Sequence, residues 1–399
     1  MQIDGGWPGA GLRGPLVSTT AAAIAVDQPS LEAVTSPLVR DAGVPGWWVD
    51  LFDSACNRSV FLSLAWIQTW LEAYERDFRG VWVRWEHFGS TVGGCLLLTR
   101  VVWKSGVPMV SLFVNATGEA VERTPLAEYN DVLHVAGYED AIATDLARII
   151  VRMRWSRLLL SGHADCSVLC RLPRLLPSAL VERDPRPAPY VDLGALPGEF
   201  EATLGGKGGS QIRRNTRLYE KEYGSCKVTA AATLAQALHF FDALSALHRT
   251  RWESRGHSGS FASDAVIDFH RRLICRLWRG GVDLVHVGNE QADVGYLYNF
   301  TSEGKVYYFQ SGFAYDGPSR LSPGLLTNCL AIEHYRRRGL REYDFMAGDM
   351  LYKRSLANGC RTLHWTVLYR DHPWVRFVLW LRTMRVRWQS RAAAPGGVA

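Results

Sequence analysis

Residues 307–354, YYFQSGFAYDGPSRLSPGLLTNCLAIEHYRRRGLREYDFMAGDMLYKR, carry the pattern from which we predict the fold. It is typical of a strand, a loop that ends in Ser-Pro-Gly, a helix, a second strand and a polar cluster. Ser322 suits the N-cap of this helix, Pro323 its first turn and Gly339 the position after its end. Free backbone N–H groups at such a helix start favour an anion. We therefore expect a phosphate site beside a strand edge; the alternative is a helix start that binds nothing.

The composition is that of an ordinary globular protein, with 47% hydrophobic and 21% charged residues in a chain of 399. This length predicts two or three domains. A net charge of +6 suits anionic small molecules or an acidic surface, but it is not the dense basic stripe of a nucleic-acid binder. We therefore expect no nucleic-acid partner.

The eight cysteines form no CxxC pair, and no metal-binding motif such as HExxH occurs. We therefore predict no metal site, and we interpret the cysteines, most of which lie in apolar stretches, as buried thiols in a reducing compartment. The first residues lack the basic start and apolar core of a signal peptide, and no apolar run is long enough to span a membrane. These features predict a cytoplasmic protein.

The chain divides into four parts by composition and periodicity. Residues 1–45 predict a flexible tail, 46–190 and 191–372 predict two lobes, and 373–399 predict a basic amphipathic helix with a tail. The proline-rich stretch 164–189 predicts the loop between the lobes. Each lobe follows the order helix, antiparallel hairpin, helix, strand. We therefore predict an α/β (α+β) fold of two tandem units, each a mixed, mainly antiparallel sheet flanked by helices.

The individual elements follow from hydrophobic spacing and turn residues. Helices are predicted at 64–74, 138–153, 233–251, 264–279 and 322–338. Strands are predicted at 81–88, 92–102, 157–160, 282–287, 292–300, 305–312, 342–346 and 361–368.

Several short motifs occur in a fixed order along the two lobes. They are YND at 129–131, SQIRRNTR at 210–217, LHRTRW at 247–252, FQSG at 309–312, SPG at 322–324 and YDFMAGDMLYK at 343–353. Together they resemble the GNAT superfamily of acyltransferases, and most closely a branch associated with cellulose biosynthesis (CelD/BcsL-like). The two-lobed layout is similar to that of Fem-type peptidyl transferases.

The resemblance implies a gap between two diverging strands, here 305–312 and 342–346, in which an acyl-CoA lies. It implies that the first strand holds the pantetheine arm and polarises the thioester carbonyl, while the helix start holds the pyrophosphate. The usual pyrophosphate loop is rich in glycine and basic residues, and this loop departs from that pattern. The implied cofactor-binding residues are Gln310, Ser311, Gly312, Arg320, Ser322, Gly324 and Leu325.

Acyl transfer to an amine needs a deprotonated nucleophile, a polarised carbonyl and a proton for the departing thiolate. Asp349 is the candidate for the acceptor side, as base or as amine-orienting group, and Tyr352 is the candidate proton donor. Lys353 would anchor a carboxylate or phosphate of the acceptor. The alternative is that Tyr352 and Lys353 only pack at a helix start. Asp344 would serve as a partner between strands or as a cap.

Two basic segments are candidates for substrate binding. Arg213 and Arg217 lie four residues apart on one helix face and could grip a phosphate or carboxylate. The alternative is a solvated face paired with nearby glutamates. A second group, His248, Arg251 and Trp252, would form part of the acceptor pocket, although a histidine on a helix face is more often structural.

Residues 374–391 combine five arginines with an apolar stripe and contain no acidic residue. This pattern is a candidate for an interfacial helix at the inner membrane surface. The alternative is packing of the stripe on the body of the protein.

These features favour an acyl-CoA-dependent N-acyltransferase, with acetyl-CoA or a longer acyl-CoA as co-substrate and no metal. Its partner would be a small-molecule amine, such as an amino sugar, in polysaccharide or natural-product biosynthesis. The alternatives are a Fem-like transferase that uses aminoacyl-tRNA, and a non-catalytic scaffold or sensor with the same fold.

Overall fold

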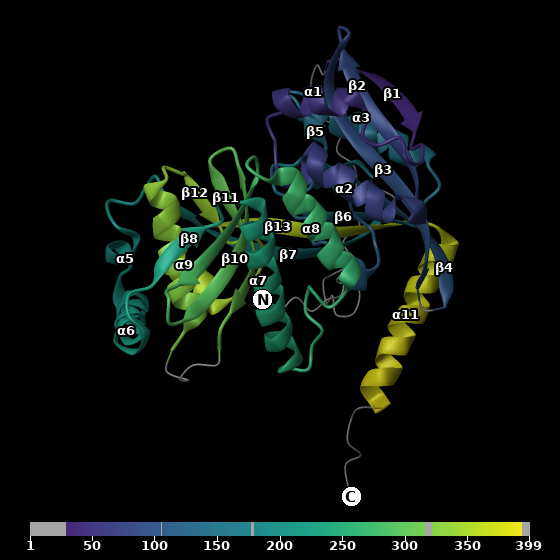
Figure 1. The fold of residues 1–399 in the computed structure, drawn as a ribbon. Coiled ribbons are helices and arrows are strands. Elements are labelled where there is room, and N and C mark those ends of the chain that lie inside the picture. Colours follow the sequence, from purple (N-terminus) through teal and green to yellow (C-terminus); the bar gives the residue numbers. More distant parts are fainter. Residues whose placement is uncertain (1–28, 105, 177–178, 316–320, 393–399) are drawn as a thin grey trace, which may run out of the picture.

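The computed structural model describes residues 29–104, 106–176, 179–315 and 321–392. Through these residues runs one 13-stranded, mostly antiparallel sheet with helices on its faces (Figure 1). The predicted fold class, mixed α/β with mainly antiparallel sheets in two tandem lobes, is confirmed. In the described part of the chain, no helix has both the length and the apolarity to cross a bilayer.

The strands, in chain order, are β1 Glu32–Pro37, β2 Arg79–His87, β3 Ser90–Lys104, β4 Val107–Val114, β5 Leu133–His134, β6 Arg157–Ala164, β7 Ala179–Asp192, β8 Lys227–Ala230, β9 Val282–Gly288, β10 Asp293–Ser302, β11 Lys305–Phe313, β12 Glu342–Asp344 and β13 Gly359–Arg370. The helices are α1 Gly46–Ser54, α2 Leu64–Tyr74, α3 Glu139–Arg152, α4 Val168–Leu175, α5 Phe200–Thr203, α6 Gly206–Tyr223, α7 Leu234–Glu253, α8 Asp264–Leu277, α9 Pro323–Arg337, α10 Leu351–Leu356 and α11 Pro373–Ala392. We call β1–β6 with α1–α4 the N-terminal lobe, and β8–β12 with α5–α10 the C-terminal lobe.

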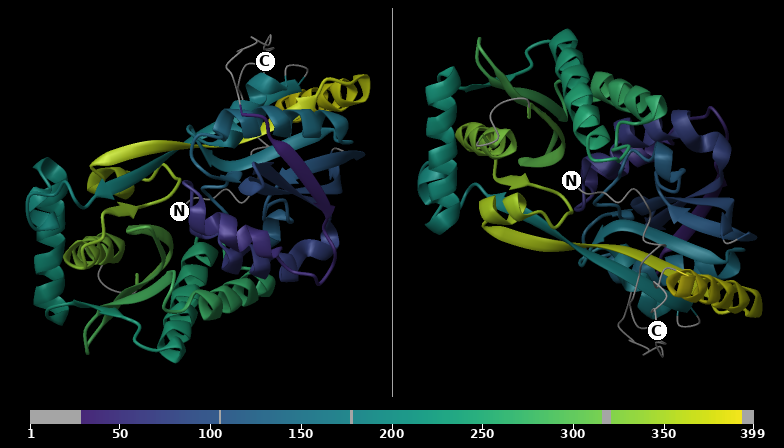
Figure 2. Two further views of the ribbon diagram at one scale, coloured as in Figure 1. Left: turned by 90° about the horizontal axis from the view of Figure 1, so that it is seen from above. Right: turned by 90° about the horizontal axis from the view of Figure 1, so that it is seen from below.

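Strands β7 and β13 join the two lobes into one sheet. β13 pairs with β6 of the N-terminal lobe on one side and with β7 on the other, and β7 pairs in turn with β12. Figure 2 shows these two long strands running from one lobe to the other. The predicted boundary between residues 190 and 191 therefore falls inside β7, and the last strand does not belong to the C-terminal lobe alone.

The proline-rich stretch predicted as a loop contains most of β7, so that prediction is wrong. Pro185, Pro187 and Pro189 alternate along the strand, and every second residue of a strand directs its backbone groups to the same side. The carbonyls of Pro187 and Pro189 accept hydrogen bonds from the N–H groups of Gly348 (2.9 Å) and Phe345 (3.0 Å). The prolines therefore face the β12 side, and the ladder with β13 keeps its N–H donors.

The flexible tail predicted at residues 1–45 is too long. Residues 32–37 form β1, which pairs antiparallel with β2 from Glu32 opposite Glu86 to Pro37 opposite Val81. This edge strand is stabilised by its neighbour rather than by an apolar alternation of its own, because most of its residues are exposed. Residues 1–28 lie outside the described residues.

The prediction that the cysteines are buried is wrong for most of them. All eight are free thiols, and only two are buried, Cys95 and Cys329. Four are exposed: Cys56, Cys166, Cys275 and Cys360.

Helices cover both faces of the sheet in the C-terminal lobe. The core cluster on one face includes residues of α7 and α8, and the cluster on the other face includes residues of α6 and α9. Helix α2 of the N-terminal lobe packs on α8, where the ring centroids of Trp66 and Phe269 lie 5.3 Å apart. Arg276 of α8 also donates to Thr69 of α2 at 2.7 Å. The core on the face covered by α7 and α8 is thus continuous with the core of the N-terminal lobe.

Candidate active site

The central strands of the C-terminal lobe separate. β11 and β12 run parallel, but their register covers only Lys305 opposite Glu342, Val306 opposite Tyr343 and Tyr307 opposite Asp344. β11 continues to Phe313, paired on its other edge with β10. β12 ends at Asp344, two residues before the predicted end of this strand, and the chain after it follows β7, because Phe345 N donates to Pro189 O at 3.0 Å. From Tyr308 onward β11 therefore runs apart from this segment.

The N-terminal lobe contains a similar parallel pair, but its gap is bridged. β4 and β6 are in register from Ser111 opposite Arg157 to Phe113 opposite Leu159. Beyond that point Asn130 donates its side-chain amide to Val114 O (3.0 Å) and its backbone N–H to Gly162 O (3.3 Å). A loop of the lobe itself thus occupies the space between these strands.

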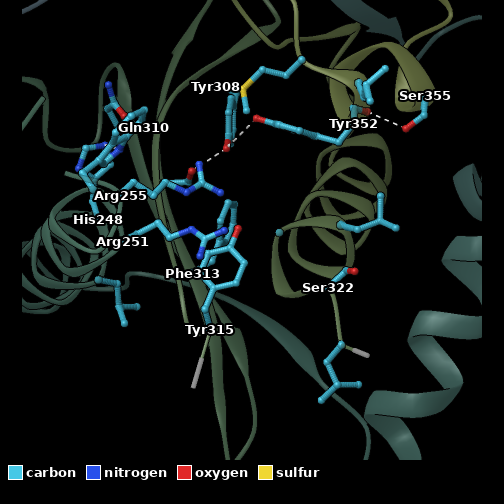
Figure 3. A pocket seen from close by; sticks show the side chains of 18 of the residues that line it. His248, Arg251, Arg255, Tyr308, Gln310, Phe313, Tyr315, Ser322, Tyr352 and Ser355 are labelled. Carbon is cyan, nitrogen blue, oxygen red and sulfur yellow. Dashed lines mark hydrogen bonds between the residues drawn. The ribbon is translucent and has the colours of Figure 1, made fainter. Parts of the chain in front are cut away.

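In the C-terminal lobe, a cavity of about 660 Å³ lies beside the free part of β11 (Figure 3). Its lining comes from β11, α7, the start of α9 and the segment around α10. The lining residues are Gln211, Leu247, His248, Arg251, Trp252, Arg255, Tyr308, Phe309, Gln310, Ser311, Phe313, Tyr315, Leu321, Ser322, Gly324, Leu325, Met350, Leu351, Tyr352 and Ser355. Of the predicted cofactor-binding residues, Gln310, Ser311, Ser322, Gly324 and Leu325 are among them.

Hydroxyl groups of three residues form a chain along the cavity. Tyr352 of α10 donates to the hydroxyl of Tyr308 on β11 at 3.4 Å, and Tyr308 donates to Ser311 Oγ at 2.6 Å. Figure 3 shows the Tyr352 ring crossing from α10 toward β11. Burial raises the pKa of Tyr352 well above its ordinary value. The phenol therefore stays protonated, so it can donate a proton or a hydrogen bond but cannot act as a base.

The end of α7 and the turn after it supply the basic side of the cavity. The guanidinium of Arg251 lies over the ring of Tyr315, 4.0 Å from its centroid, and Arg255 reaches into the same space (Figure 3). Trp252 donates its indole N–H to His248 Nε2 at 2.9 Å. Burial lowers the pKa of His248 to about 4, so the ring is neutral at pH 7 and carries its hydrogen on Nδ1.

Arg255 is a cavity residue that was not predicted. It lies two residues beyond the end of α7, in a turn in which its N–H donates to Trp252 O at 3.0 Å. Its position four residues after Arg251 was the one sequence signal that pointed to it.

The start of α9 offers fewer free donors than the Ser-Pro-Gly motif suggested. Pro323 has no N–H, and the N–H groups of Leu325 and Leu326 donate to the carbonyl of Ser322 at 3.1 and 3.2 Å. Ser322 itself makes no side-chain cap hydrogen bond. Arg320, the predicted basic residue of this loop, lies outside the described residues. Among the described residues, Arg251 of α7 and Arg255 in the turn after it are thus the cationic groups of the cavity.

Two predicted acceptor residues are positioned for other roles. The Lys353 side chain is fully buried, and its Nζ donates to the carbonyls of Phe345 (2.7 Å) and Ala347 (3.1 Å). Burial lowers the pKa of this amine to about 8. Lys353 therefore fixes the loop after β12 rather than anchoring a substrate. Asp349 pairs in solvent with Arg354, outside the cavity lining, which does not suit a catalytic base.

Three further predicted residues lie outside the cavity lining. Arg213 donates to Leu204 O at 3.4 Å, and Arg217 is exposed on α6. Gly312 permits packing, since a Cβ there would lie 2.4 Å from the carbonyl oxygen of Leu244 on α7. The residue between the two arginines that does reach the site is Asn215, which exchanges two hydrogen bonds with Ser322.

Comparison with known families agrees with this geometry. Residues 207–354 match the family model described as "Acetyltransferase (GNAT) domain". The match extends from α6 to α10 and so includes both separated strands. The C-terminal lobe is therefore similar to GNAT acetyltransferase domains.

Solved structures extend the similarity to both lobes. FemX matches with a TM-score of 0.51 at 11% identity, over 84% of this chain and 96% of its own. L-PGS from Bacillus licheniformis matches with a TM-score of 0.50 at 9% identity, over 86% of this chain and 98% of its own. A tandem GNAT protein from the clavulanic acid biosynthesis pathway has a TM-score of 0.45 at 13% identity, over 86% and 99%. Because the identities are only 11% and 9%, the matches to FemX and L-PGS show a shared fold. No curated protein matches the sequence.

Proposed function

We propose that the C-terminal lobe transfers an acyl group from an acyl-CoA, acetyl-CoA or longer, to a small-molecule amine. The observation that carries this proposal is the cavity of about 660 Å³ at the point where β11 and β12 separate within a lobe similar to GNAT domains. Small-molecule sites usually have volumes of about 300–1,000 Å³. The cavity thus has room for the acylated end of the cofactor together with an acceptor.

The free edge of β11, from Tyr308 to Phe313, would hold the pantetheine arm, because an extended chain can hydrogen-bond to an open strand edge. A backbone N–H of this edge would polarise the thioester carbonyl. Arg251 and Arg255 would bind the diphosphate together with the start of α9 at Gly324.

In the proposed reaction, the amine nitrogen attacks the thioester carbonyl carbon and a C–N bond forms. Collapse of the tetrahedral intermediate breaks the C–S bond, and the thiolate takes a proton. Tyr352 is the donor that we propose for this proton, because its phenol is protonated and lines the cavity. The amine would arrive as the free base and release its own proton to solvent, and the Tyr352 phenolate would take a proton back from solvent before the next turnover.

A screen of acyl-CoAs against amine acceptors, read as loss of thioester absorbance, tests this proposal. We expect acceptor-dependent cleavage by the wild type, and about a 100-fold lower kcat for Tyr352→Phe. Tyr369→Phe is the matched control, since Tyr369 donates to Glu182 away from the cavity. Absence of cleavage with every acyl-CoA, or equal kcat in the two variants, would contradict the proposal.

The second candidate is transfer from aminoacyl-tRNA, which is favoured by the FemX-like fold of both lobes. The same assay with charged tRNA in place of acyl-CoA separates the two donors. A third candidate is a non-catalytic scaffold or sensor, which binds acyl-CoA but releases no CoA.

We further propose a cytoplasmic role, since acyl-CoA is an intracellular co-substrate, and amino sugars of a polysaccharide or a natural-product intermediate as acceptors. The motif order that resembles the cellulose-associated branch supports this acceptor class.

Contact with an anionic membrane is a separate part of the proposal. α11 packs Val375 and Val378 into the core, but it leaves Trp374, Phe377 and Trp380 exposed. Figure 1 shows the helix extending beyond the body. The five arginines and the absence of acidic residues in 374–391 complement anionic lipid headgroups. The buried valines thus agree with packing of the stripe on the body of the protein, and the exposed aromatic residues support the proposed membrane contact.

A further inference from the structure

The N-terminal lobe contains a cluster of three potential metal ligands outside the cavity lining. Cys56 Sγ, a ring nitrogen of His134 and a carboxylate oxygen of Glu139 all lie within 4.8 Å of one another. Cys56 follows α1, His134 ends β5 and Glu139 begins α3, so three segments meet here. Because these residues are spread over 84 positions, no ligand-spacing motif reveals the cluster in the sequence.

The histidine is held in the orientation that a metal ligand needs. His134 Nδ1 lies 2.8 Å from the carbonyl oxygen of Val132, which can accept only from an N–H. The hydrogen of a neutral ring therefore sits on Nδ1, and the lone pair of Nε2 points toward the cluster. A backbone carbonyl on the far nitrogen is a common outer partner of metal-binding histidines.

The contacts of the two ring nitrogens argue against a catalytic Cys-His-Glu triad. In a triad, one ring nitrogen contacts the nucleophile and the other the acid. Here Nδ1 contacts the carbonyl oxygen of Val132, and the glutamate lies on the side of Nε2. The distance from Nε2 to Glu139 Oε1 is 3.4 Å, which is about the edge of a tetrahedron whose centre lies about 2.1 Å from each ligand atom.

The segment that carries Cys56 is fixed to the strand that carries His134. Cys56 N donates to His134 O at 3.0 Å, and His134 N donates to Asn57 Oδ1 at 3.1 Å. Asn57 Nδ2 donates to Asp131 Oδ2 (3.0 Å) and to Val132 O (2.7 Å). Two of the three ligands are thus placed by the backbone itself, before any ion binds. Asp131 adds a second carboxylate near the cluster.

We propose that Cys56, His134 and Glu139 form a Zn²⁺ site. A thiolate, an imidazole and a carboxylate are the ligand types that zinc combines in tetrahedral sites, with water at the remaining position. Cys56 is exposed, so the ion can enter from solvent. On binding, the Cys56 thiol loses its proton to solvent and an S–Zn bond forms. The ion ties the loop after α1 to β5 and to the start of α3, and so stabilises the N-terminal lobe.

The test uses the full chain, freed of metal with a chelator, and compares the wild type with Cys56→Ser and Cys275→Ser. Cys275 is an exposed thiol on α8 outside the cluster and serves as the matched control. Co²⁺ replaces Zn²⁺ as a spectroscopic probe, because a cobalt–thiolate bond gives charge-transfer absorption in the near ultraviolet.

We expect one equivalent of Co²⁺ with charge-transfer absorption in the wild type and in Cys275→Ser, displaced by one equivalent of Zn²⁺. Cys56→Ser loses the absorption and binds Zn²⁺ at least 10-fold more weakly in competition with a chromophoric chelator. Zinc raises the thermal midpoint of the wild type but not that of Cys56→Ser. Absence of the absorption in the wild type, or equal zinc affinity in all three proteins, would overturn the proposal. A Glu139→Gln variant that keeps wild-type affinity would also contradict it.

Discussion

Asn215 of α6 and Ser322 at the start of α9 exchange two hydrogen bonds. The Asn215 amide donates to Ser322 O at 2.9 Å, and Ser322 N donates to Asn215 Oδ1 at 2.9 Å. Asn215 is buried and Ser322 lines the cavity. An asparagine side chain thus holds the backbone where the proposed diphosphate site begins.

Removing this side chain should loosen the site as well as the fold. Asn215→Ala removes the partner of the Ser322 N–H and one of the donors to Ser322 O, which we expect to lower the free energy of unfolding by about 1–3 kcal/mol. We also expect acyl-CoA binding, measured by calorimetry, to weaken about 10-fold, because the start of α9 becomes mobile.

Asn358 offers a matched control, because it makes the same reciprocal pair with Asp192 (2.7 and 3.1 Å) away from the cavity. Asn358→Ala should reduce stability but leave acyl-CoA affinity unchanged. Equal affinity of the Asn215 and Asn358 variants would show that the pairing with Ser322 is only structural.

The charge of Arg255 should contribute to acyl-CoA binding. Arg255→Gln removes a guanidinium from the cavity lining, and we expect about a 10-fold loss of affinity, typical of one charge-assisted hydrogen bond. The salt dependence of binding should fall as well. Arg249→Gln, near the end of α7 but outside this cavity, should bind like the wild type. A loss of the same size in both variants would point to the overall positive charge of this region instead.

Gly312 should be required for packing. A Cβ at this position would lie 2.4 Å from Leu244 O and 2.9 Å from Leu244 Cα, so Gly312→Ala must push α7 away from β11. We expect a loss of about 1–3 kcal/mol in the free energy of unfolding, measured with denaturant. Gly280→Ala, where no atom lies within 4 Å of the added Cβ, should change it by less than about 0.5 kcal/mol. Wild-type stability of Gly312→Ala would disprove the tight contact.

His248 should make stability depend on pH. Burial lowers the pKa of His248 to about 4 from 6.5, so between these values the unfolded chain binds more protons than the folded one. Stability is therefore complete above pH 6.5 and decreases as the pH falls toward 4. The full effect of one such residue is at most about 3 kcal/mol.

The contribution of His248 to the pH dependence of stability can be measured by comparing two histidine variants with the wild type. His248→Gln keeps an acceptor for the Trp252 indole but does not titrate, so its stability should fall less between pH 6.5 and pH 4. His239→Gln changes an exposed residue of the same helix and should keep the wild-type slope. If both variants followed the wild-type profile, His248 would not be held neutral by burial.

The exposed aromatic residues of α11 should decide membrane binding. Replacing Trp374, Phe377 and Trp380 by serine removes the exposed apolar face while leaving Val375 and Val378 in the core. We expect the wild type to float with anionic vesicles and the triple variant to stay behind. Phe88→Ser and Trp103→Ser, at exposed aromatic positions of the N-terminal lobe outside α11, should float like the wild type. Flotation that is unchanged in a chain truncated at Asp371 would remove the membrane proposal.

The sequence predicted those parts of the fold that local signals determine. Ser63 caps α2 as a serine before an apolar helix should, and the expected helix at 322–338 is observed at Pro323–Arg337. The loop prediction for the prolines of β7 was wrong because a strand accepts a proline wherever no neighbouring strand needs an N–H at that position. That information lies in the pairing with β13 and β12, not in the local sequence.

The candidate site was predictable where one element supplied it, and not where distant segments meet. Gln310, Ser311 and Tyr352 belong to motifs and line the cavity. Lys353 appeared equivalent to Tyr352, yet burial and three neighbouring carbonyls give it a structural role. Asn215 finds its partner 107 residues away, a relation that the sequence does not display.

A crystal structure of the protein with a non-hydrolysable acyl-CoA analogue tests the central claim most directly. We predict that the pantetheine arm lies along Tyr308–Phe313 in the gap beside β12, with the thioester carbonyl near Tyr352 and the diphosphate near Arg251 and Gly324. An analogue bound elsewhere, or an empty gap at saturating concentration, would contradict the proposed acyltransferase site.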